Sequence, residues 1–379
     1  TFNMKILLSL YSSANTFNLR IGLIDSLLQL GHQVIVLSPS DSYSNQLKTP
    51  GVDYHSIEIN HKQTNLYRYF CLTISYIKKF KQIKPDLVLS FNIKPNIFGN
   101  FAAGYLSIPV VNNITGTGTL FIKKSFSNFI VKFLYRLSFR FSSHTFFNNS
   151  SDQFHFYKFK IIDTVFSSLV HGSELNTGIY KYNKTVNQGR SFLFVGRLLV
   201  DKEIYEYLEA IKVVLKKNPD LEFLMATELE ANNKTALSVS DLDNSIKDIP
   251  QIKYLGEIDD MVNLYKTVDV MVLPSSREGL SKSLIEAASM SLPLITTDVP
   301  DCKDIVVDGH NGFLCQPNDS NSLANAILKM SQIDGYIRHQ MGLNNRKKVM
   351  EKFDEQLIIS DYLNIMKAVG TEKGSSDKH

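Results

Sequence analysis

An alternation of strand-like apolar runs and helix-spaced apolar positions, begun twice along the chain, is the feature that most constrains the fold. An apolar run at residues 4–10 precedes leucines at helical spacing over 19–30 and a second run at 34–37. Further apolar runs predict strands at 86–90 and 108–112. Strands that alternate with helices predict a parallel sheet with helices on its faces.

The second half of the chain starts the same alternation afresh. We expect strands at 191–195, 221–225, 252–255, 268–274 and 294–297, and helices at 204–217, 261–267 and 282–290. The polar segment 171–189 is rich in Asn, Gly, Thr and Lys and is the expected linker. The pattern therefore predicts two consecutive doubly wound domains whose ligands bind outside the carboxyl ends of the strands.

The expected domains are an N-terminal Rossmann-like domain over residues 1–175 and a C-terminal one over 176–352. A helix within 353–379 is expected to pack back on the first domain, ahead of a disordered tail. A length of 379 residues suits two cores better than one.

Three cysteines, Cys71, Cys302 and Cys315, are an odd number without metal-ligand spacing, which argues against a disulfide framework or a zinc site. The apolar start lacks a small-residue cleavage site and is interpreted as a strand rather than a signal peptide. No apolar run approaches the roughly 20 residues of a membrane span. These features favour a reducing, cytoplasmic setting.

Charge is distributed unevenly. Up to Tyr180 there are 17 Lys and Arg against 8 Asp and Glu, and beyond it 24 against 29, so the halves carry about +9 and −5. The basic first half is expected to face lipid headgroups or a phosphorylated substrate. No nucleic-acid-binding motif accompanies the charge, and no nucleic-acid partner is expected.

One segment of the second half, residues 274–287, ends a predicted strand, crosses a turn of small residues and opens a helix. Free backbone N–H groups at a helix start attract phosphate. Glu278 precedes the helix and Glu286 lies about one turn inside it, where carboxylates suit vicinal hydroxyls. Taken alone, two such glutamates are more often ordinary surface charges. The residues expected to bind a phosphate-bearing ligand here are Gly279, Leu280, Ser281, Lys282, Ser283 and Glu286.

The pair Glu278 and Glu286, with seven residues between them, resembles the signature of the retaining GT-B glycosyltransferases of family four. Segments 292–300 and 307–314 resemble the same family. The resemblance is clearest over residues 190–330. It implies an α/β GT-B fold, two Rossmann-like domains facing an interdomain cleft, and a nucleoside-diphosphate sugar as co-substrate. It also implies that Glu278 holds the transferred sugar and Glu286 the ribose.

Arg197 and Lys202 stand five residues apart at an expected strand-to-helix turn. Such cations can converge on one diphosphate, and the resemblance implies that they neutralise the leaving nucleoside diphosphate. Together with Glu278 they are the expected catalytic residues. Glu203 departs from the family pattern, because the family usually has Gly there. An added carboxylate is expected to weaken donor binding or to reshape this loop.

A strand end, residues 254–256, resembles the edge of the family's site that reads the nucleotide base through main-chain groups. Leu255 and Gly256 are the expected contacts. A plain strand-end turn is the alternative interpretation.

The resemblance places acceptor contacts on loops of the first half. The loop expected over residues 11–16 offers Asn15 and Thr16, although a helix N-cap at Thr16 or Asn18 explains the same residues. A second loop, at 112–121, offers three further candidates, namely Thr115, Gly116 and Thr117. This loop resembles a subset that transfers amino sugars to polyprenyl-diphosphate-linked acceptors. It lacks the histidine of many relatives, and His171 is interpreted as structural.

Aromatic residues alternate with Lys and Arg over residues 121–141, and over 67–81 to a similar degree. Helices with this composition suit a lipid interface. An amphipathic helix packed on its own sheet is the alternative, and it explains the aromatic residues better than the cations.

The resemblance implies a retaining hexosyltransferase, and because no carboxylate pair has metal-ligand spacing, no metal or other cofactor is expected. The resemblance implies a sugar, an N-acetylhexosamine or related hexose, moved from UDP to an undecaprenyl-diphosphate-linked saccharide. The expected setting is the cytoplasmic face of the inner membrane, in the synthesis of a bacterial surface polysaccharide such as O-antigen, capsule or another glycan. The alternatives are a non-catalytic nucleotide-sugar-binding scaffold and a GT-B epimerase or hydrolase of sugar nucleotides.

Overall fold

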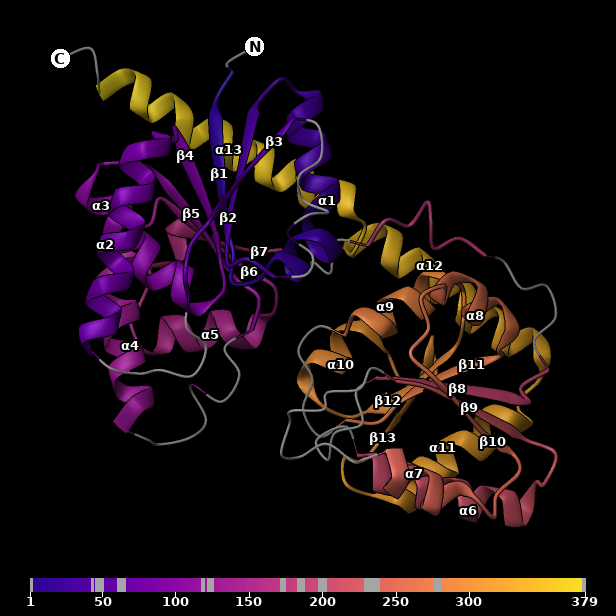
Figure 1. Cartoon of the computed structure of the whole chain (residues 1–379). Coiled ribbons are helices and arrows are strands. Elements are labelled where there is room, and N and C mark those ends of the chain that lie inside the picture. The colour runs from indigo at the N-terminus through magenta and orange to yellow at the C-terminus, as the bar shows by residue number, and fades with distance from the viewer. Residues whose placement is uncertain are drawn as a thin grey trace. The chain divides into compact units, whose positions relative to one another are not determined.

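The computed structural model describes residues 3–41, 44, 51–59, 66–116, 120, 126–170, 175–182, 188–196, 203–227, 239–275 and 281–376. The chain forms two compact units. The first joins Thr1–Glu174 with Glu355–His379, and the second is Leu175–Asp354. Each unit contains one parallel sheet covered by helices (Figure 1).

The sheet of the first unit runs in the order β3-β2-β1-β4-β5-β6-β7, and its neighbouring strands pair in parallel. Its strands are β1 (Lys5–Ser9), β2 (Gln33–Ser38), β3 (Val52–Ser56), β4 (Leu87–Phe91), β5 (Val110–Ile114), β6 (His144–Phe147) and β7 (Ser167–Leu169). The order changes direction at β1, so the topological switch point lies between β1 and β4. Ligands of doubly wound sheets bind outside the carboxyl ends of the strands at such a point.

The two faces of this sheet are covered by different helices, because successive strand side chains point to opposite faces. Ile6 and Leu8 pack with α1 and α13, whereas Leu7 packs with α2, α3, α4 and α5. The helical elements are α1 (Ser13–Gln29), α2 (Leu66–Ile83), η1 (Pro95–Gly99), α3 (Asn100–Tyr105), α4 (Phe126–Ser138), η2 (Phe139–Phe141), α5 (Ser150–Lys158), η3 (Thr164–Phe166) and α13 (Glu355–Ser376).

The second unit has the sheet order β10-β9-β8-β11-β12-β13 with parallel pairing throughout, and its switch point lies between β8 and β11. Its strands are β8 (Ser191–Val195), β9 (Glu222–Ala226), β10 (Ile252–Gly256), β11 (Val270–Leu273), β12 (Leu294–Thr297) and β13 (Gly312–Cys315). Its helices are α6 (Ile204–Lys217), α7 (Val239–Ile246), α8 (Met261–Thr267), α9 (Lys282–Ser289), α10 (Pro300–Ile305), α11 (Ser320–Gln332) and α12 (Gly335–Lys352). The predicted α/β class with two doubly wound sheets is confirmed.

Two local predictions in the first unit were wrong. The helix after β1 begins at Ser13, so the expected loop over residues 11–16 is shorter and Thr16 and Asn18 lie inside α1 rather than at its N-cap. Ser, Asn and Thr are only mildly unfavourable in a helix. The polarity of these residues alone therefore placed the predicted start of α1 too late. Strand β5 runs to Ile114, past the expected end at 112, because its pairing with β4 continues to Asn113 and its pairing with β6 continues to Ile114.

Among the described residues, no helix combines the length and the apolarity that a bilayer crossing needs.

Candidate active site

The start of α9 lies at the switch point of the second sheet. Ser281 caps this helix, its Oγ accepting from the Leu284 amide at 3.4 Å. The Ser283 hydroxyl donates to the carbonyl oxygen of Val195, the last residue of β8, at 3.2 Å. The helix start is thereby fixed to the carboxyl end of β8. The amides of Lys282 and Ser283 precede the first intrahelical bond, the arrangement that favours anions at helix starts.

The carboxyl end of β11 is held equally firmly. The amide of Ser275 donates to the Thr297 hydroxyl oxygen at 3.2 Å, and that hydroxyl donates back to the Ser275 carbonyl oxygen. Residues 276–280 follow directly. Ser275 is therefore fastened to β12, and Ser281 is fixed by its role as the helix cap.

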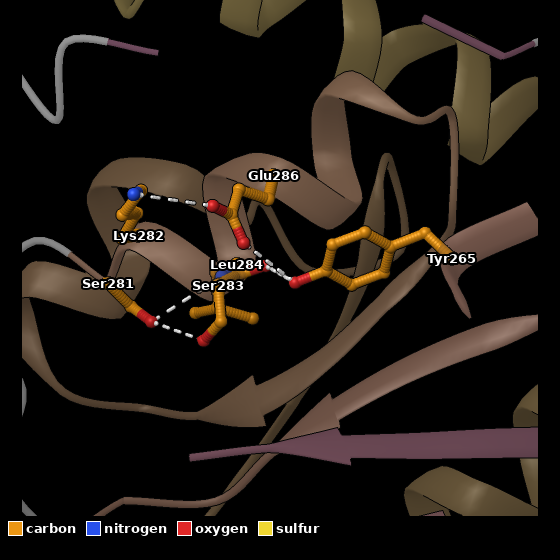
Figure 2. A network of polar contacts seen from close by, with 6 residues as sticks. All are labelled: Tyr265, Ser281, Lys282, Ser283, Leu284 and Glu286. Atoms are coloured by element: carbon orange, nitrogen blue, oxygen red, sulfur yellow. Dashed lines mark hydrogen bonds and ion pairs between the residues drawn. The ribbon is translucent and has the colours of Figure 1, made fainter. Parts of the chain in front are cut away.

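Glu286 is the buried acid of the site, with 6% of its surface exposed. Its Oε2 accepts from the Tyr265 hydroxyl at 3.0 Å, and its Oε1 lies 3.7 Å from Nζ of Lys282, one turn earlier on α9. Figure 2 shows Lys282 on one side of the carboxyl and Tyr265 on the other. The carboxyl is thus positioned by two different elements, α8 and α9.

A second phenol reaches Glu286 from outside the helices. The Tyr180 phenol lies beside the Glu286 carboxyl and lowers its pKa, and its ring centroid lies 6.5 Å from that of Tyr265. The carbonyl oxygen of Tyr180 accepts from Ser289 Oγ at 2.7 Å and from Arg346 Nη1 at 2.8 Å. The segment that carries Tyr180 is therefore fastened to α9 and α12.

The electrostatics of Glu286 follow from its burial. Desolvation raises the pKa of Glu286 above its usual range, and the nearby Lys282 with the hydroxyls of Tyr180 and Tyr265 lowers it part of the way back. Burial, followed by the adjacent Glu286 charge, raises the pKa values of Tyr180 and Tyr265. Both phenols therefore stay protonated at neutral pH and act as hydrogen-bond donors.

Glu203 adopts a left-handed backbone conformation, with φ of 49°, immediately before α6. Residues with a side chain rarely adopt this conformation, which explains why the family pattern has Gly here. The Glu203 side chain is only 2% exposed, and Oε1 has no hydrogen-bond partner among the described residues. Burial raises its pKa, against a smaller opposing effect from the Asn318 backbone.

The predicted base-reading edge forms the end of β10. Gly256 has φ of +71°, and a Cβ built on it would meet no atom within 4 Å. The Gly256 carbonyl oxygen accepts from the Thr227 amide at 2.9 Å, and Thr227 Oγ1 donates to Tyr254 Oη at 3.2 Å. The half-buried Leu255 lies beside this open position.

The candidate acceptor residues are spread over the first unit. Thr115 and Gly116 follow β5; Thr115 Oγ1 accepts from Asn92 Nδ2 at 3.4 Å, and Gly116 is exposed. Asn15 and Thr16 lie in the N-terminal part of α1. Among the described residues, no group of three or more His, Cys, Asp or Glu side chains is arranged to hold a metal.

The structure brings Ser281, Lys282, Ser283 and Glu286 together around the start of α9. Six other predicted residues and His171 lie outside the described residues: Arg197, Lys202, Glu278, Gly279, Leu280 and Thr117. The sequence patterns missed Tyr180 and Tyr265. A tyrosine at an apolar position of a short amphipathic helix, or in a linker, carries no signal that separates it from a packing residue.

Family models match both units. The model described as glycosyl transferases group 1 matches residues 189–332, and the model described as glycosyl transferase 4-like matches residues 5–149. The match over residues 5–149 covers most of the sheet of the first unit. The match over residues 189–332 covers the sheet of the second unit together with the site around α9.

Three relatives illustrate the similarity. The Campylobacter jejuni N,N'-diacetylbacillosaminyl-diphospho-undecaprenol alpha-1,3-N-acetylgalactosaminyltransferase is 23% identical over 96% of this chain and 98% of its own length. The Escherichia coli UDP-Gal:alpha-D-GlcNAc-diphosphoundecaprenol alpha-1,3-galactosyltransferase is 27% identical over 74% and 75%. The Staphylococcus aureus capsular polysaccharide biosynthesis glycosyltransferase CapM is 32% identical, over 47% of this chain and 46% of its own length.

Solved structures share the fold. A glycosyltransferase from Rickettsia africae superposes with a TM-score of 0.80 at 17% identity, covering 97% of this chain and 99% of its own. Anabaena HepE in complex with UDP gives a TM-score of 0.77 at 17% identity, covering 96% and 100%. Two doubly wound parallel sheets with a helix start at the second switch point define the class of GT-B proteins. Within that class, both units match glycosyltransferase family models, one over residues 189–332 and the other over residues 5–149.

Proposed function

We propose that this protein transfers a sugar from a nucleoside diphosphate to a lipid-linked saccharide with retention of anomeric configuration. The observation that carries the proposal is the buried Glu286 carboxyl beside the start of α9, at the switch point of the second sheet. A helix start suits a diphosphate, and a fixed carboxylate suits the vicinal hydroxyls of a ribose. Gly256 offers an open main-chain edge for the base.

The donor is expected to carry UDP and an N-acetylhexosamine or related hexose. UDP occupies the Anabaena neighbour, and the name of the E. coli relative specifies a UDP-linked hexose. The names of the C. jejuni and E. coli relatives both specify undecaprenyl-diphosphate-linked acceptors. The proposed pathway is therefore synthesis of a bacterial surface polysaccharide, with a polyprenyl-diphosphate-linked saccharide as the acceptor.

The proposed chemistry breaks the bond between the sugar C1 and the diphosphate oxygen while an acceptor oxygen bonds to C1 from the same face. The acceptor proton passes to the departing phosphate. Arg197 and Lys202 stabilise the growing negative charge together with the start of α9, and Glu278 holds the sugar. These cations take the part that a metal plays in other transferases, so we expect the rate to be unchanged by EDTA.

The test is release of nucleoside diphosphate from a panel of sugar nucleotides, with and without lipid-linked acceptors. We expect acceptor-dependent release that Lys202→Ala reduces about a hundredfold. The matched control is Lys216→Ala, which removes an exposed cation in the last turn of α6. Equal release without acceptor would identify a hydrolase, and binding without release would identify a scaffold.

We further propose that the first unit docks on the anionic cytoplasmic face of the membrane through the surface formed by α2 and α4. Neither helix contains an Asp or Glu, whereas α2 carries Arg68 and three lysines and α4 carries Lys132 and Arg136. Both helices pack on η1. The same side of the first sheet carries α2, α3 and α4 in Figure 1.

Exposed aromatic residues accompany these cations. Phe129 and Phe133 on α4 are 66% and 54% exposed, and Tyr67 and Phe70 on α2 are also exposed. Aromatic rings with Lys and Arg between them are typical of helices that lie in the lipid interface. Packing on the sheet accounts for the buried Tyr135 of α4 but not for its exposed rings.

Vesicle flotation tests this docking surface. We expect binding to phosphatidylglycerol vesicles, weaker binding to phosphatidylcholine vesicles, and weakening by salt. Phe129→Ser with Phe133→Ser should lower binding more than tenfold, since each ring contributes about 1 kcal/mol or more when buried. The control Tyr336→Ser removes an equally exposed ring from the second unit. Equal flotation of the double variant and the control would refute the assignment.

A further inference from the structure

The hydrogen bonds of Glu286 leave part of its carboxylate available. An ionised carboxylate offers about four acceptor positions. Tyr265, Tyr180 and Lys282 are its three neighbours. The Lys282 contact is the long one, at 3.7 Å, and the Lys282 side chain is 43% exposed. Lys282 is therefore the neighbour that an incoming ligand can displace most easily.

The two phenols are held much more firmly than Lys282. Tyr265 is fully buried on α8, and its hydroxyl also lies 3.3 Å from the Ser283 carbonyl oxygen at the start of α9. Tyr180 is fastened through its carbonyl oxygen to Arg346 of α12. Because a side chain fixed by packing and hydrogen bonds holds its partner within a narrow range of orientations, the carboxylate plane of Glu286 is fixed as well.

We propose that Tyr265 and Tyr180 are positioning residues that hold the Glu286 carboxylate ready to accept the vicinal hydroxyls of the donor ribose, with Lys282 as the neighbour that gives way. This inference rests on the proposed role of Glu286 in donor binding. It adds that preference for a ribonucleotide over a deoxyribonucleotide depends on two hydroxyl groups that do not touch the ligand.

The experiment measures binding of UDP and of 2'-deoxy-UDP to the full chain by calorimetry. Tyr265→Phe and Tyr180→Phe should each weaken UDP binding about tenfold and leave binding of the deoxy analogue nearly unchanged. The matched control is Tyr207→Phe. Tyr207 is fully buried in the same unit, and its hydroxyl has no partner among the described residues, so its loss should change neither affinity.

A pH profile separates positioning from general loss of structure. The groups that face the Glu286 carboxyl are Lys282 from α9, Tyr265 from α8 and Tyr180 from the segment before β8, while Asp260 acts on Tyr180 and Arg346 holds its carbonyl. Loss of the Tyr265 hydroxyl removes a bond to the ionised form and raises the pKa of Glu286. The acid limb of UDP binding should then move to higher pH in Tyr265→Phe.

The outcomes distinguish this inference from the function on which it rests. If Glu286→Gln leaves the preference for UDP over the deoxy analogue intact, the proposed ribose contact is wrong. If Glu286→Gln abolishes the preference but both tyrosine variants keep it with an unshifted acid limb, the positioning role alone is wrong. Loss of UDP affinity in Tyr207→Phe equal to that in Tyr265→Phe would also overturn it.

Discussion

At the scale of single residues, Glu203 combines two unfavourable features that the family glycine avoids. A left-handed backbone costs a residue with a side chain roughly 1–2 kcal/mol, and the buried carboxyl oxygen Oε1 lacks a partner among the described residues. We expect Glu203→Gly to raise the free energy of unfolding of the second unit by about 1 kcal/mol, after the entropic penalty of Gly. Denaturant unfolding measures this change.

Ser291 provides the control for Glu203→Gly. It has φ of 62°, is buried, and also has a hydroxyl without a partner among the described residues, but it carries no charge. Ser291→Gly therefore reports the backbone together with an unpaired neutral hydroxyl but no charge, and it should stabilise less. An equal or larger gain in Ser291→Gly would show that the Glu203 carboxyl is not a destabilising group.

The same carboxyls predict a pH dependence of stability. Burial raises the pKa of Glu203 and of Glu286 above the ordinary 4.5. A raised native pKa means that the stabilising contribution is complete below about pH 4.5 and is lost as pH rises through the native value. As the pH rises above about 4.5, these two groups should therefore make the second unit progressively less stable. The neutral variant Glu203→Gln should flatten this slope, and an unchanged slope would contradict the assignment.

How far the sequence predicts this site depends on the kind of residue. Ser281 and Glu286 follow a strand-to-helix turn, and both occupy the expected places at the start and in the second turn of α9. Tyr265 is set beside Glu286 only by the packing of α8 on α9, a contact between elements that spacing along the chain does not encode. The roles of Arg197, Lys202 and Glu278 stay predictions.

At the scale of elements, the strand and helix bounds of the second half were predicted closely, because β-branched and aromatic runs alternate there with clear amphipathic helices. The expected 204–217 and 261–267 coincide with α6 and α8. The first half was predicted less well. Its helix α1 begins with polar residues, and the side chain of Asn113 in β5 bonds to the neighbouring strand β4.

Helix α12 packs against α9, the helix that carries Glu286. A Cβ on Gly342 of α12 would lie 2.0 Å from the Ser291 carbonyl oxygen, in the turn that follows α9. Ala favours a helix over Gly by about 1 kcal/mol, but overpacking against backbone costs about 1–3 kcal/mol. We expect Gly342→Ala to destabilise the second unit by about 1–2 kcal/mol and to weaken UDP binding several-fold, measured by thermal unfolding and calorimetry.

The control for Gly342→Ala lies on the same helix. Met350 is 51% exposed, so Met350→Ala changes little packing and should shift stability by less than about 0.5 kcal/mol. If Gly342→Ala is as stable as the parent chain, α12 and α9 can move apart without loss of stability. The close contact between Gly342 and Ser291 then does not position the site.

At the scale of the whole molecule, the chain crosses between its units twice, because the last helix belongs to the first unit. Residues 353–379 were expected to form a helix on the first domain, and α13 spans Glu355–Ser376 within that unit. Its Tyr362 packs against Phe91 and Phe146 of the first sheet, and its hydroxyl donates to the Asn113 amide oxygen. Helix α13 thus packs in the same hydrophobic core as β1 and α1.

This arrangement predicts that damage to α13 affects one unit only. Tyr362→Ala removes a buried ring and a buried hydrogen bond, and it should lower the free energy of unfolding of the first unit by about 3–5 kcal/mol. UDP affinity should be retained, because Glu286 and its neighbours lie in the second unit. Calorimetry would then show a transition at lower temperature that UDP does not shift, and a second transition that UDP still raises.

Leu357→Ala, at an exposed position of α13, should leave both transitions in place. A single transition that falls as a whole and loses its response to UDP would mean that the two units unfold together, and that the last helix stabilises the donor site as much as the core it covers.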